Sequence, residues 1–321
     1  MPAEQPAVKP IATGVITQAK GAHLGEFFQA LADSPAAGTV AVADDSGESE
    51  ALAGKILKQK LTGFFRSSQE MLARQKPRFA VVSMESVRAP AEIRRCLEAG
   101  SHVLTEKPAC TRAEDFEPLT QLAEMRHLNL ALALANRPHA PIQEARRLLQ
   151  KQILGRLYGI EMHLVADQSR LTRDDYQQSW RCDRERSGGG HLAWLGIHWI
   201  DTAQYITGLK IRRVAGFTEN VGGQPITVED SAAMALEFDG GIFGTLTSGF
   251  YLDRHYKFHI RRYHSHMRIW GSHGWLELSS FEDQPLIYAS RRLPDASEQI
   301  FQYPAGQRSY TPFVNAAVQA A

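Results

Sequence analysis

The apolar positions of the first part of the chain fall into short runs that alternate with segments of helical periodicity. The predicted strands are residues 11–16, 40–44, 77–83, 102–105 and 129–134. Residues 89–100 and 115–124 carry apolar residues at helical spacing between them. Strands that alternate with helices of this length favour an α/β domain with a doubly wound parallel sheet. We expect this domain to occupy residues 1–135.

After about residue 136 the pattern changes. Residues 141–152 predict a helix, and residues 157–165 alternate apolar and polar positions as a half-buried strand does. The later strand-like segments are 213–219, 231–238, 242–251, 266–270 and 275–279, with Gly240-Gly241 as a hairpin turn. We therefore expect an α+β domain over residues 136–321, with a large, mostly antiparallel sheet and one helix, 192–207, packed on it.

Composition and charge exclude several classes of protein. The formal net charge is +1, and basic runs such as Arg261-Arg262 are short, so nothing indicates nucleic-acid or membrane binding. No apolar run approaches the roughly 20 residues of a membrane helix, and residues 1–10 lack a signal-peptide core. The three cysteines show neither metal-ligand spacing nor a disulfide framework, and Cys96 is expected in the core. We expect a cytoplasmic protein of enzyme size.

The tripeptide Glu106-Lys107-Pro108 directly follows the strand predicted at 102–105. Proline biases the residue before it toward an extended conformation, so Lys107 is held at a stiff strand end. In an open α/β sheet, ligands bind at the carboxyl ends of the strands. Lys107 is therefore a candidate proton donor or acceptor. The alternative is a surface lysine beyond an edge strand.

The order of these segments resembles the glucose-fructose oxidoreductase / inositol dehydrogenase (Gfo/Idh/MocA) family over nearly the whole chain. The matching stretches are 98–104, Glu106-Lys107-Pro108, Asn136-Arg137, 187–190 with Gly196, His198, Asp201 and Gly208 after it, 228–230 and 271–275. The resemblance implies a Rossmann domain that binds a nicotinamide dinucleotide and a second domain for substrate binding and oligomerisation. In the family, a further helix after the one at residues 313–316 returns to the first domain, whereas this sequence stops at Ala321, as expected of a truncated or a shortened member.

The turn after the first strand departs from the family's glycine-rich pattern. Residues 17–23 read TQAKGAH, about two residues short, and of the usual glycines only Gly21 is kept. The resemblance places Thr17, Gln18 and Gly21 at the cofactor's pyrophosphate, with Lys20 adding charge. The alternative is a turn that binds a dinucleotide poorly or not at all.

Asp44 ends the second predicted strand, where an acidic residue bonds the adenosine ribose hydroxyls. Asp45 follows and no arginine does, so two carboxylates would repel a 2′-phosphate. We therefore expect NAD rather than NADP as the cofactor. The alternative is that residues 44–47 form only a polar turn.

The resemblance adds further residues to the cofactor cleft: Ser83, Glu85, Glu106 and Asn136. Residues 85–88 read Glu-Ser-Val-Arg where the family usually has Thr-Pro-Asn-His. Glu85 would then replace one polar contact, and Arg88 is a candidate contact to a phosphate or an acidic substrate.

The triple glycine at 188–190 opens the family's second signature. In that signature an Asp lies four residues after the last glycine, and a His lies four residues after the Asp. Here Trp194 takes the position of the Asp, and His198 matches the His. Lys107 and His198 are the implied catalytic pair, one as the base and the other as its orienter. The alternatives for His198 are a structural histidine and a local pair with Asp201.

Four residues are implied as substrate contacts: Trp180, Arg181, His191 and Trp194. By i, i+3, i+4 spacing His191, Trp194, His198 and Asp201 share one helix face and are expected to point toward one cleft. Trp194 would stack on the substrate, Arg181 would reach the nicotinamide amide or a substrate oxygen, and the glycines would let the backbone approach the ligand. Arg137 and Arg181 would equally suit salt bridges between domains.

The last third of the chain holds several histidines: His255, His259, His264, His266 and His273. Only His264 and His266 share a strand face, and no cysteine or paired glutamate has matching spacing. We expect no metal site.

These features predict a NAD-dependent dehydrogenase acting on a secondary alcohol of a sugar, polyol or cyclitol. We expect a homo-oligomer, a dimer or tetramer, formed through the second domain's sheet, since an exposed apolar face is a liability. One rival is a non-catalytic ligand-binding or regulatory relative, which the short turn, residues 85–88 and Trp194 favour. Another is a lyase or hydrolase with tightly held NAD, which Lys107 and His198 would serve equally.

Overall fold

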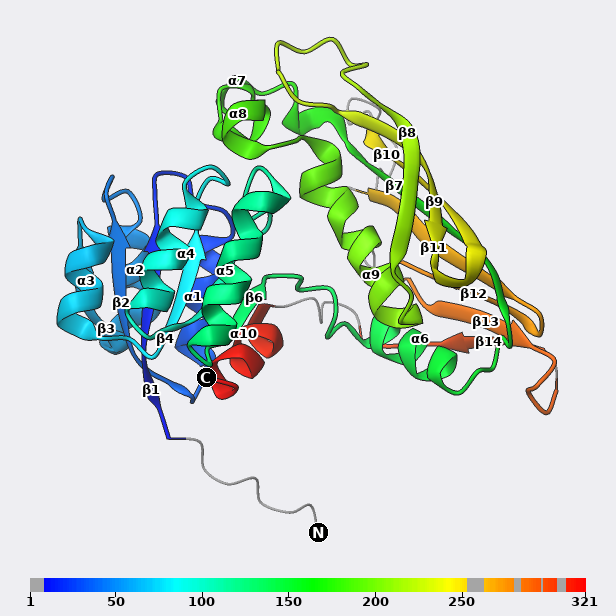
Figure 1. Cartoon of the computed structure of the whole chain (residues 1–321), viewed down its shortest axis with the longest axis horizontal. Helices are drawn as coiled ribbons and strands as arrows, with labels where there is room; N and C mark the ends of the chain where they lie inside the picture. Colours follow the sequence, from blue (N-terminus) through cyan, green and yellow to red (C-terminus); the bar gives the residue numbers. More distant parts are fainter. Residues whose placement is uncertain (1–8, 253–262, 280–283, 296, 305–309) are drawn as a thin grey trace. The chain divides into compact units, whose positions relative to one another are not determined.

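The computed structural model describes residues 9–252, 263–279, 284–295, 297–304 and 310–321, and Figure 1 traces the chain. It divides into two compact units. The first comprises Met1–Ala133, Glu185–Gly188 and Ser309–Ala321, and the second comprises Leu134–Arg184 and Gly189–Arg308. The predicted boundary after residue 135 lies close to the first change of unit. Residues 185–188 and 309–321, expected in the second domain, group with the first unit.

The first unit is built on a parallel sheet whose described strands run in the order β3-β2-β1-β4-β5-β6. The strands are β1 Ile11–Thr17, β2 Ala37–Asp44, β3 Leu61–Phe65, β4 Phe79–Ser83, β5 His102–Thr105 and β6 Leu130–Leu132. This is the strand order of a Rossmann sheet. The strands stay parallel, but the order in which they are added to the sheet reverses between β1 and β4. The doubly wound sheet predicted from the sequence is confirmed, with β3 as an additional strand.

Helices cover both faces of this sheet (Figure 1). They are α1 Leu24–Asp33, α2 Glu50–Leu57, α3 Ser68–Gln75, α4 Ala89–Glu98, α5 Ala113–Met125 and α10 Tyr310–Gln319. One apolar core joins the sheet to α1, α2 and α10, and a second joins it to α3, α4 and α5. Cys96 is fully buried in the second core, as predicted.

Helix α10 corrects the expectation that the helix returning to the first domain would lie beyond residues 313–316 and be missing from this sequence. α10 itself spans these residues and already packs in the first unit. Val314 and Val318 are buried against α1, and the Ser34 hydroxyl donates to Asn315 Oδ1 at 2.7 Å. Arg78 Nε also donates to the backbone oxygen of Ala321 at 2.6 Å.

The second unit is built on a large sheet whose described strands run in the order β14-β13-β12-β11-β7-β10-β9-β8. They are β7 Leu157–Asp167, β8 Ile211–Glu219, β9 Ser231–Phe238, β10 Ile242–Leu252, β11 Tyr263–Gly271, β12 Gly274–Leu278, β13 Leu286–Ser290 and β14 Glu298–Phe301. All neighbouring strands pair antiparallel except β7 and β10. The mostly antiparallel sheet is confirmed, and β13 and β14 extend it beyond the prediction.

Two helices lie on this sheet, α6 Ala140–Gln150 and α9 Ile197–Thr207 (Figure 1). The prediction named only one packed helix. α9 is fixed by Trp199, which is fully buried and donates from Nε1 to the backbone oxygen of His163 on β7 at 3.0 Å. A π-helical turn, Leu192–Gly196, precedes α9 directly. The short helices α7 Asp174–Gln177 and α8 Arg184–Ser187 precede the triple glycine.

None of the described helices is both long and apolar enough to cross a membrane. His255, His259 and Arg261-Arg262 lie outside the described residues.

Candidate functional site

A pocket of about 230 Å³ opens at the carboxyl ends of β1, β2 and β4 in the first unit. Its lining is polar and rich in arginine: Thr17, Asp44, Asp45, Arg66, Ser67, Ser68, Gln69, Arg88, Glu92 and Arg95, with Ile16, Ala43 and Met84. Strand ends at the switch point of an open parallel sheet are where such folds hold nucleotides. The fold therefore brings the predicted cofactor residues Thr17 and Asp44 to one pocket.

The turn after β1 is fastened to the end of β4. The Thr17 hydroxyl donates to the backbone oxygen of Ser83 at 2.7 Å, and the Ser83 hydroxyl donates to the backbone oxygen of Ala22 at 2.6 Å. A Cβ on Gly21 would fall 2.2 Å from Thr17 Oγ1, so this close packing accounts for the one glycine that the turn retains. A hydroxyl has a single proton to donate, and the Thr17 and Ser83 hydroxyls both donate theirs to backbone oxygens.

Gln18 is also engaged within the first unit. Its side chain is buried, and Oε1 accepts from Glu85 N at 3.2 Å and from Arg88 Nη1 at 3.4 Å. Helix α1 begins only at Leu24, after His23 in a left-handed conformation. The Gln18 side chain thus ties the shortened turn to Glu85 and Arg88.

Asp44 is buried, and its carboxylate is saturated by the loop that follows β2. Oδ1 accepts from the backbone N and hydroxyl of Ser46, and Oδ2 accepts from the backbone N and hydroxyl of Ser49, at 2.7–3.0 Å. Burial raises the pKa of Asp44, but these hydrogen bonds outweigh it and hold the pKa below its usual value. A carboxylate offers about four lone-pair sites, so Asp44 has none left for a ribose hydroxyl.

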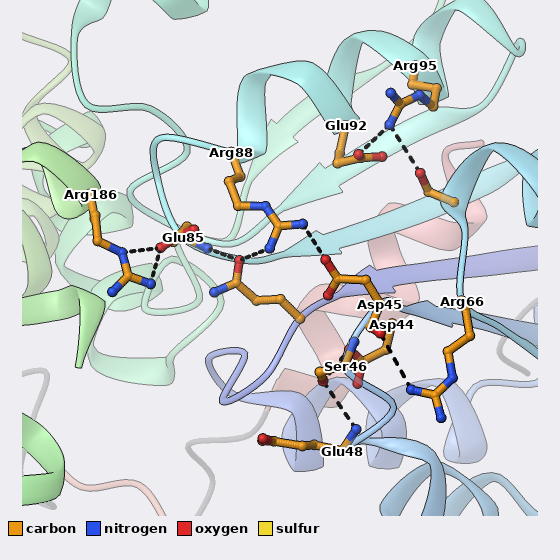
Figure 2. A network of polar contacts seen from close by, with 12 residues as sticks. Asp44, Asp45, Ser46, Glu48, Arg66, Glu85, Arg88, Glu92, Arg95 and Arg186 are labelled. Atoms are coloured by element: carbon orange, nitrogen blue, oxygen red, sulfur yellow. Dashed lines mark hydrogen bonds and ion pairs between the residues drawn. The ribbon is translucent and has the colours of Figure 1, made fainter. Parts of the chain in front are cut away.

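Asp45 is paired with an arginine that the sequence reasoning did not place beside it. Arg88 Nη2 donates to Asp45 Oδ2 at 2.7 Å (Figure 2). Arg66, which follows β3, brings Nη1 to 3.5 Å from the Asp45 backbone oxygen. The expectation of NAD over NADP rested on two adjacent carboxylates that no arginine follows in the sequence, but in the fold Arg88 and Arg66 both approach Asp45. Arg66 was missed because β3 was not identified, so nothing placed residue 66 at a strand end.

Lys107 lies directly after β5 and is buried. Its backbone N–H donates to Oε1 of the buried Glu106 at 3.0 Å. The other Glu106 oxygen lies 3.1 Å from His23 Nδ1, and the His23 ring lies over Tyr310 with 5.3 Å between ring centres. Lys107 is therefore a buried amine at the carboxyl edge of the sheet, not a surface lysine.

Glu85 anchors the returning segment 185–188 on the first unit. Arg186 donates from Nε and Nη2 to Glu85 Oε2, both at 2.7 Å, and Val87 N donates to the Arg186 backbone oxygen (Figure 2). Gly188 has a φ of +82°, and a Cβ there would fall 2.7 Å from Thr111 Cα. The role of Glu85 is thus an ion pair that sequence reasoning did not anticipate.

In the second unit three predicted substrate residues form one cluster. The Arg181 guanidinium carbon lies 4.9 Å from the Trp180 ring centre and 5.2 Å from that of Trp194. The two indoles lie 5.1 Å apart, and both side chains are buried. Arg181 and Trp180 therefore cover the Trp194 ring that was expected to stack on the substrate.

His191 is fully buried beside this cluster. Its ring meets Phe250 edge-on with 4.4 Å between ring centres, and Nδ1 lies 2.8 Å from Ser248 Oγ. Burial and the Arg170 charge lower the pKa of His191 to about 3, so the imidazole is neutral near pH 7. His191 and Trp194 border a cavity of about 10 Å³, room for about one water.

Asp201, which was expected on one helix face with His191, Trp194 and His198, is paired with Arg137. Arg137 Nε donates to Asp201 Oδ2 at 3.0 Å, and Arg137 Nη2 donates to Oδ1. The Arg137 salt bridge therefore forms within the second unit. His198 is buried on α9. The π-helical turn uses i→i+5 bonding, so ordinary helical spacing does not carry across it.

Asn136 belongs to the second unit and is buried at the turn before α6, where its backbone oxygen accepts from His139 N at 3.0 Å. His264 and His266 flank His163 on the sheet, with ring centres 5.1 and 5.2 Å from it. Within the described residues no three His, Cys, Asp or Glu side chains group closely enough to hold a metal ion.

Comparison with protein families connects both units to one family. Residues 14–134 match the model described as "Oxidoreductase family, NAD-binding Rossmann fold", and residues 142–277 match the GFO/IDH/MocA C-terminal domain. The chain belongs to the GFO/IDH/MocA oxidoreductase family. The resemblance read from the sequence motifs is confirmed.

Two relatives and one solved structure illustrate the similarity. A dTDP-3,4-didehydro-2,6-dideoxy-alpha-D-glucose 3-reductase of Saccharopolyspora spinosa is 28% identical over 267 residues, 83% of this chain and 74% of that protein. The D-glucoside 3-dehydrogenase of Escherichia coli (strain K12) is 30% identical over 169 residues, 47% of this chain and 46% of that protein. An oxidoreductase domain protein of Kribbella flavida shares the fold, with a TM-score of 0.84 and 22% identity over 97% of this chain and 90% of that one. The chain spans about half the length of several curated relatives that it matches.

The first unit fits an adenine dinucleotide at its adenosine end. The pocket lies at the expected strand ends, and its arginine and serine side chains suit a ligand that carries phosphate. The turn after β1 fits less well, because the Thr17 hydroxyl and the Gln18 side chain are already engaged. The strongest match to the cofactor is therefore the pocket at the carboxyl ends of β1, β2, β3 and β4.

Proposed function

We propose that this protein is an oxidoreductase that transfers a hydride between a nicotinamide cofactor and a secondary alcohol of a sugar, polyol or cyclitol. The observation that carries the proposal is the buried Lys107 at the carboxyl edge of a sheet with dinucleotide-binding strand order. A nicotinamide cofactor would supply the hydride chemistry. Relatives named as a D-glucoside 3-dehydrogenase and a dTDP-sugar 3-reductase support the substrate class.

In this proposal Lys107 takes or gives the proton of the substrate hydroxyl. Its position is set by β5 before it, by Pro108 after it, and by the bond from its N–H to Glu106. A positioned proton donor or acceptor in a buried place contributes typically about 100- to 10 000-fold to a rate. His198, which stands at the family's histidine position on α9, is the second residue that we assign to the substrate hydroxyl.

The remaining residues of the second unit shape the substrate side. Arg181, which contacts both indoles, presents a fixed cation, and the neutral imidazole of His191 offers hydrogen bonding without a charge. We assign these residues to substrate positioning and not to proton transfer.

The test follows the accumulation of reduced nicotinamide when the protein is offered NAD or NADP with a panel of sugars, polyols and cyclitols. Accumulation with at least one substrate is the expected result. Substrate turnover with bound nucleotide and no released reduced cofactor would indicate the lyase or hydrolase alternative. If the protein neither binds a nucleotide nor turns over any substrate, the proposal is overturned in favour of a non-catalytic relative. The engaged side chains of Thr17, Gln18 and Asp44 would then explain the lack of binding.

Self-association through the open face of the second sheet is also part of the proposal. Phe217 on β8 and Phe243 on β10 are 85% and 66% exposed, and the strand register puts both on one face. Ser248, on the opposite face of β10, contacts His191 in the helical layer. Exposed apolar groups of this kind mark association surfaces. Sedimentation should show a dimer or tetramer that Phe217→Glu with Phe243→Glu converts to monomer; a monomeric parent protein would refute it.

A further inference from the structure

We propose that the pocket at the ends of β2, β3 and β4 binds a phosphate on the adenosine ribose, with Arg66 as its main ligand, so that the cofactor is NADP. This rests on the proposed function, since it specifies the cofactor of the same site. It reverses the expectation drawn from Asp44 and Asp45 in the sequence.

A free carboxylate at the end of the second strand is the group that bonds ribose hydroxyls in NAD-binding Rossmann folds. Asp44 occupies that position, yet its two oxygens accept four hydrogen bonds from Ser46 and Ser49. The side chain is also 1% exposed. Asp44 therefore shapes the β2–α2 loop and offers no acceptor to a ribose.

Asp45 is the exposed carboxylate of the pocket lining, and Arg88 pairs with it at 2.7 Å. Glu92 is likewise paired with Arg95. Asp45 and Glu92 are thus each paired with an arginine, while the charge of Asp44 is buried and solvated by the Ser46 and Ser49 donors, so the exposed rim of the pocket carries no unpaired carboxylate from these residues.

Arg66 and Arg88 approach Asp45 from different sides (Figure 2). The Arg66 guanidinium also lies against Gly47. A Cβ on Gly47, whose φ is +77°, would fall 1.9 Å from Arg66 Nη1. The Arg66 guanidinium carbon lies 5.9 Å from the Phe64 ring centre. No described carboxylate forms an ion pair with Arg66, so its charge is available to a ligand.

The chemistry of this corner favours phosphate over a neutral hydroxyl. Arginine presents a planar set of donors that matches a phosphate, and such charge-assisted hydrogen bonds are the strong ones. Ser67 and Ser68 line the pocket next to Arg66. A 2′-phosphate would complete this corner, whereas the ribose of NAD would leave the arginine without a partner.

The experiment uses calorimetry with ligands that differ only in the ribose phosphate. Adenosine 2′,5′-bisphosphate is compared with adenosine 5′-monophosphate, and adenosine 3′,5′-bisphosphate controls for added charge at the neighbouring position. We expect the 2′,5′-bisphosphate to bind about 10- to 100-fold more tightly than the monophosphate. Arg66→Met should remove this preference and leave monophosphate affinity unchanged, while Arg66→Lys should retain part of it.

Arg94→Met is the matched control, because Arg94 is exposed on α4 and does not line the pocket. Equal affinity for the mono- and bisphosphates, or a preference that survives Arg66→Met, would overturn the inference. Loss of the preference for the 2′,5′-bisphosphate in Arg88→Met, with the preference kept in Arg66→Met, would assign the phosphate contact to Arg88 and equally overturn it. If the monophosphate binds and reduced nicotinamide accumulates with NAD but not NADP, the inference fails while the proposed function stands.

Discussion

Replacing Lys107 by methionine is expected to lower kcat/KM for the alcohol substrate by about 100- to 10 000-fold, the usual contribution of a positioned acid or base. Methionine keeps the length and the apolar stem of the side chain but can neither accept nor donate the substrate proton. Lys107 is 2% exposed, so bulk water is poorly placed to substitute for it. The loss should appear mainly in kcat, because the residue acts on the reacting proton and not on the adenosine end of the cofactor.

The design separates chemistry from folding and cofactor binding. Removing one partner of a buried polar contact destabilises a protein, so thermal unfolding is measured in parallel and activity is assayed well below the unfolding transition of the variant. Nucleotide affinity, measured by calorimetry, should remain. Lys55→Met, at an exposed position on α2, is the matched control and should have parent activity. Lys107→Met with more than a tenth of the parent kcat would remove Lys107 from the proton transfer.

The fold was largely predictable because strand and helix periodicity dominate the local signal. The strands at 102–105 and 231–238 have the predicted bounds, and the other predicted strands are shifted by only a few residues. The segment that escaped prediction in the first unit is β3, whose residues are only partly buried and follow a lysine-rich stretch. Edge strands of this kind carry a weak apolar signal.

The candidate site was less predictable, since its residues depend on partners that are distant in sequence. Asp44 looked like a ribose ligand until the positions of Ser46 and Ser49 showed where its oxygens bond. Arg88 and Arg66 meet the same loop from positions 43 and 21 residues beyond Asp45. No local pattern encodes these contacts; identifying β3 would have been the one signal for Arg66.

Helix phase was the other source of error. The helical face drawn from His191 to Asp201 assumed uninterrupted i, i+3, i+4 spacing, and the π-helical turn at Leu192–Gly196 breaks that spacing. The sequence Leu-Ala-Trp-Leu-Gly carries no proline or charge that would announce the change. The partner of Asp201, Arg137, lies 64 residues earlier in the chain.

Replacing Gly190 by alanine is expected to destabilise the protein by about 3 kcal/mol or more, an overpacking cost at the upper end of the usual range. A Cβ at this position would lie 1.9 Å from the backbone oxygen of Glu229 and 2.9 Å from its carbonyl carbon. These are backbone atoms, so no side-chain rotation relieves the contact. The midpoint of thermal unfolding should fall by roughly 5–10 °C.

Glu229 explains why the backbone comes so close there. Its Oε1 accepts from Gly190 N at 2.8 Å and from Leu192 N at 3.1 Å, and its backbone oxygen accepts from His191 N at 3.0 Å. These bonds satisfy amides at the start of a helix that have no partner within the helix. The triple glycine was expected to make room for a ligand, but at Gly190 the chain itself fills that space.

A double variant tests this account directly. Glu229→Ala removes the carboxylate but leaves the backbone oxygen, so Gly190→Ala with Glu229→Ala should be no more stable than Gly190→Ala alone. Rescue by Glu229→Ala would show that the conflict lies with the side chain and would contradict the packing described. Gly54→Ala is the matched control: this exposed helical glycine in α2 has open space at its Cβ, and alanine there should raise stability by about 1 kcal/mol. A parent-like melting temperature for Gly190→Ala would show that the Glu229 backbone is not fixed, and the helix start would then be free to adjust around a ligand.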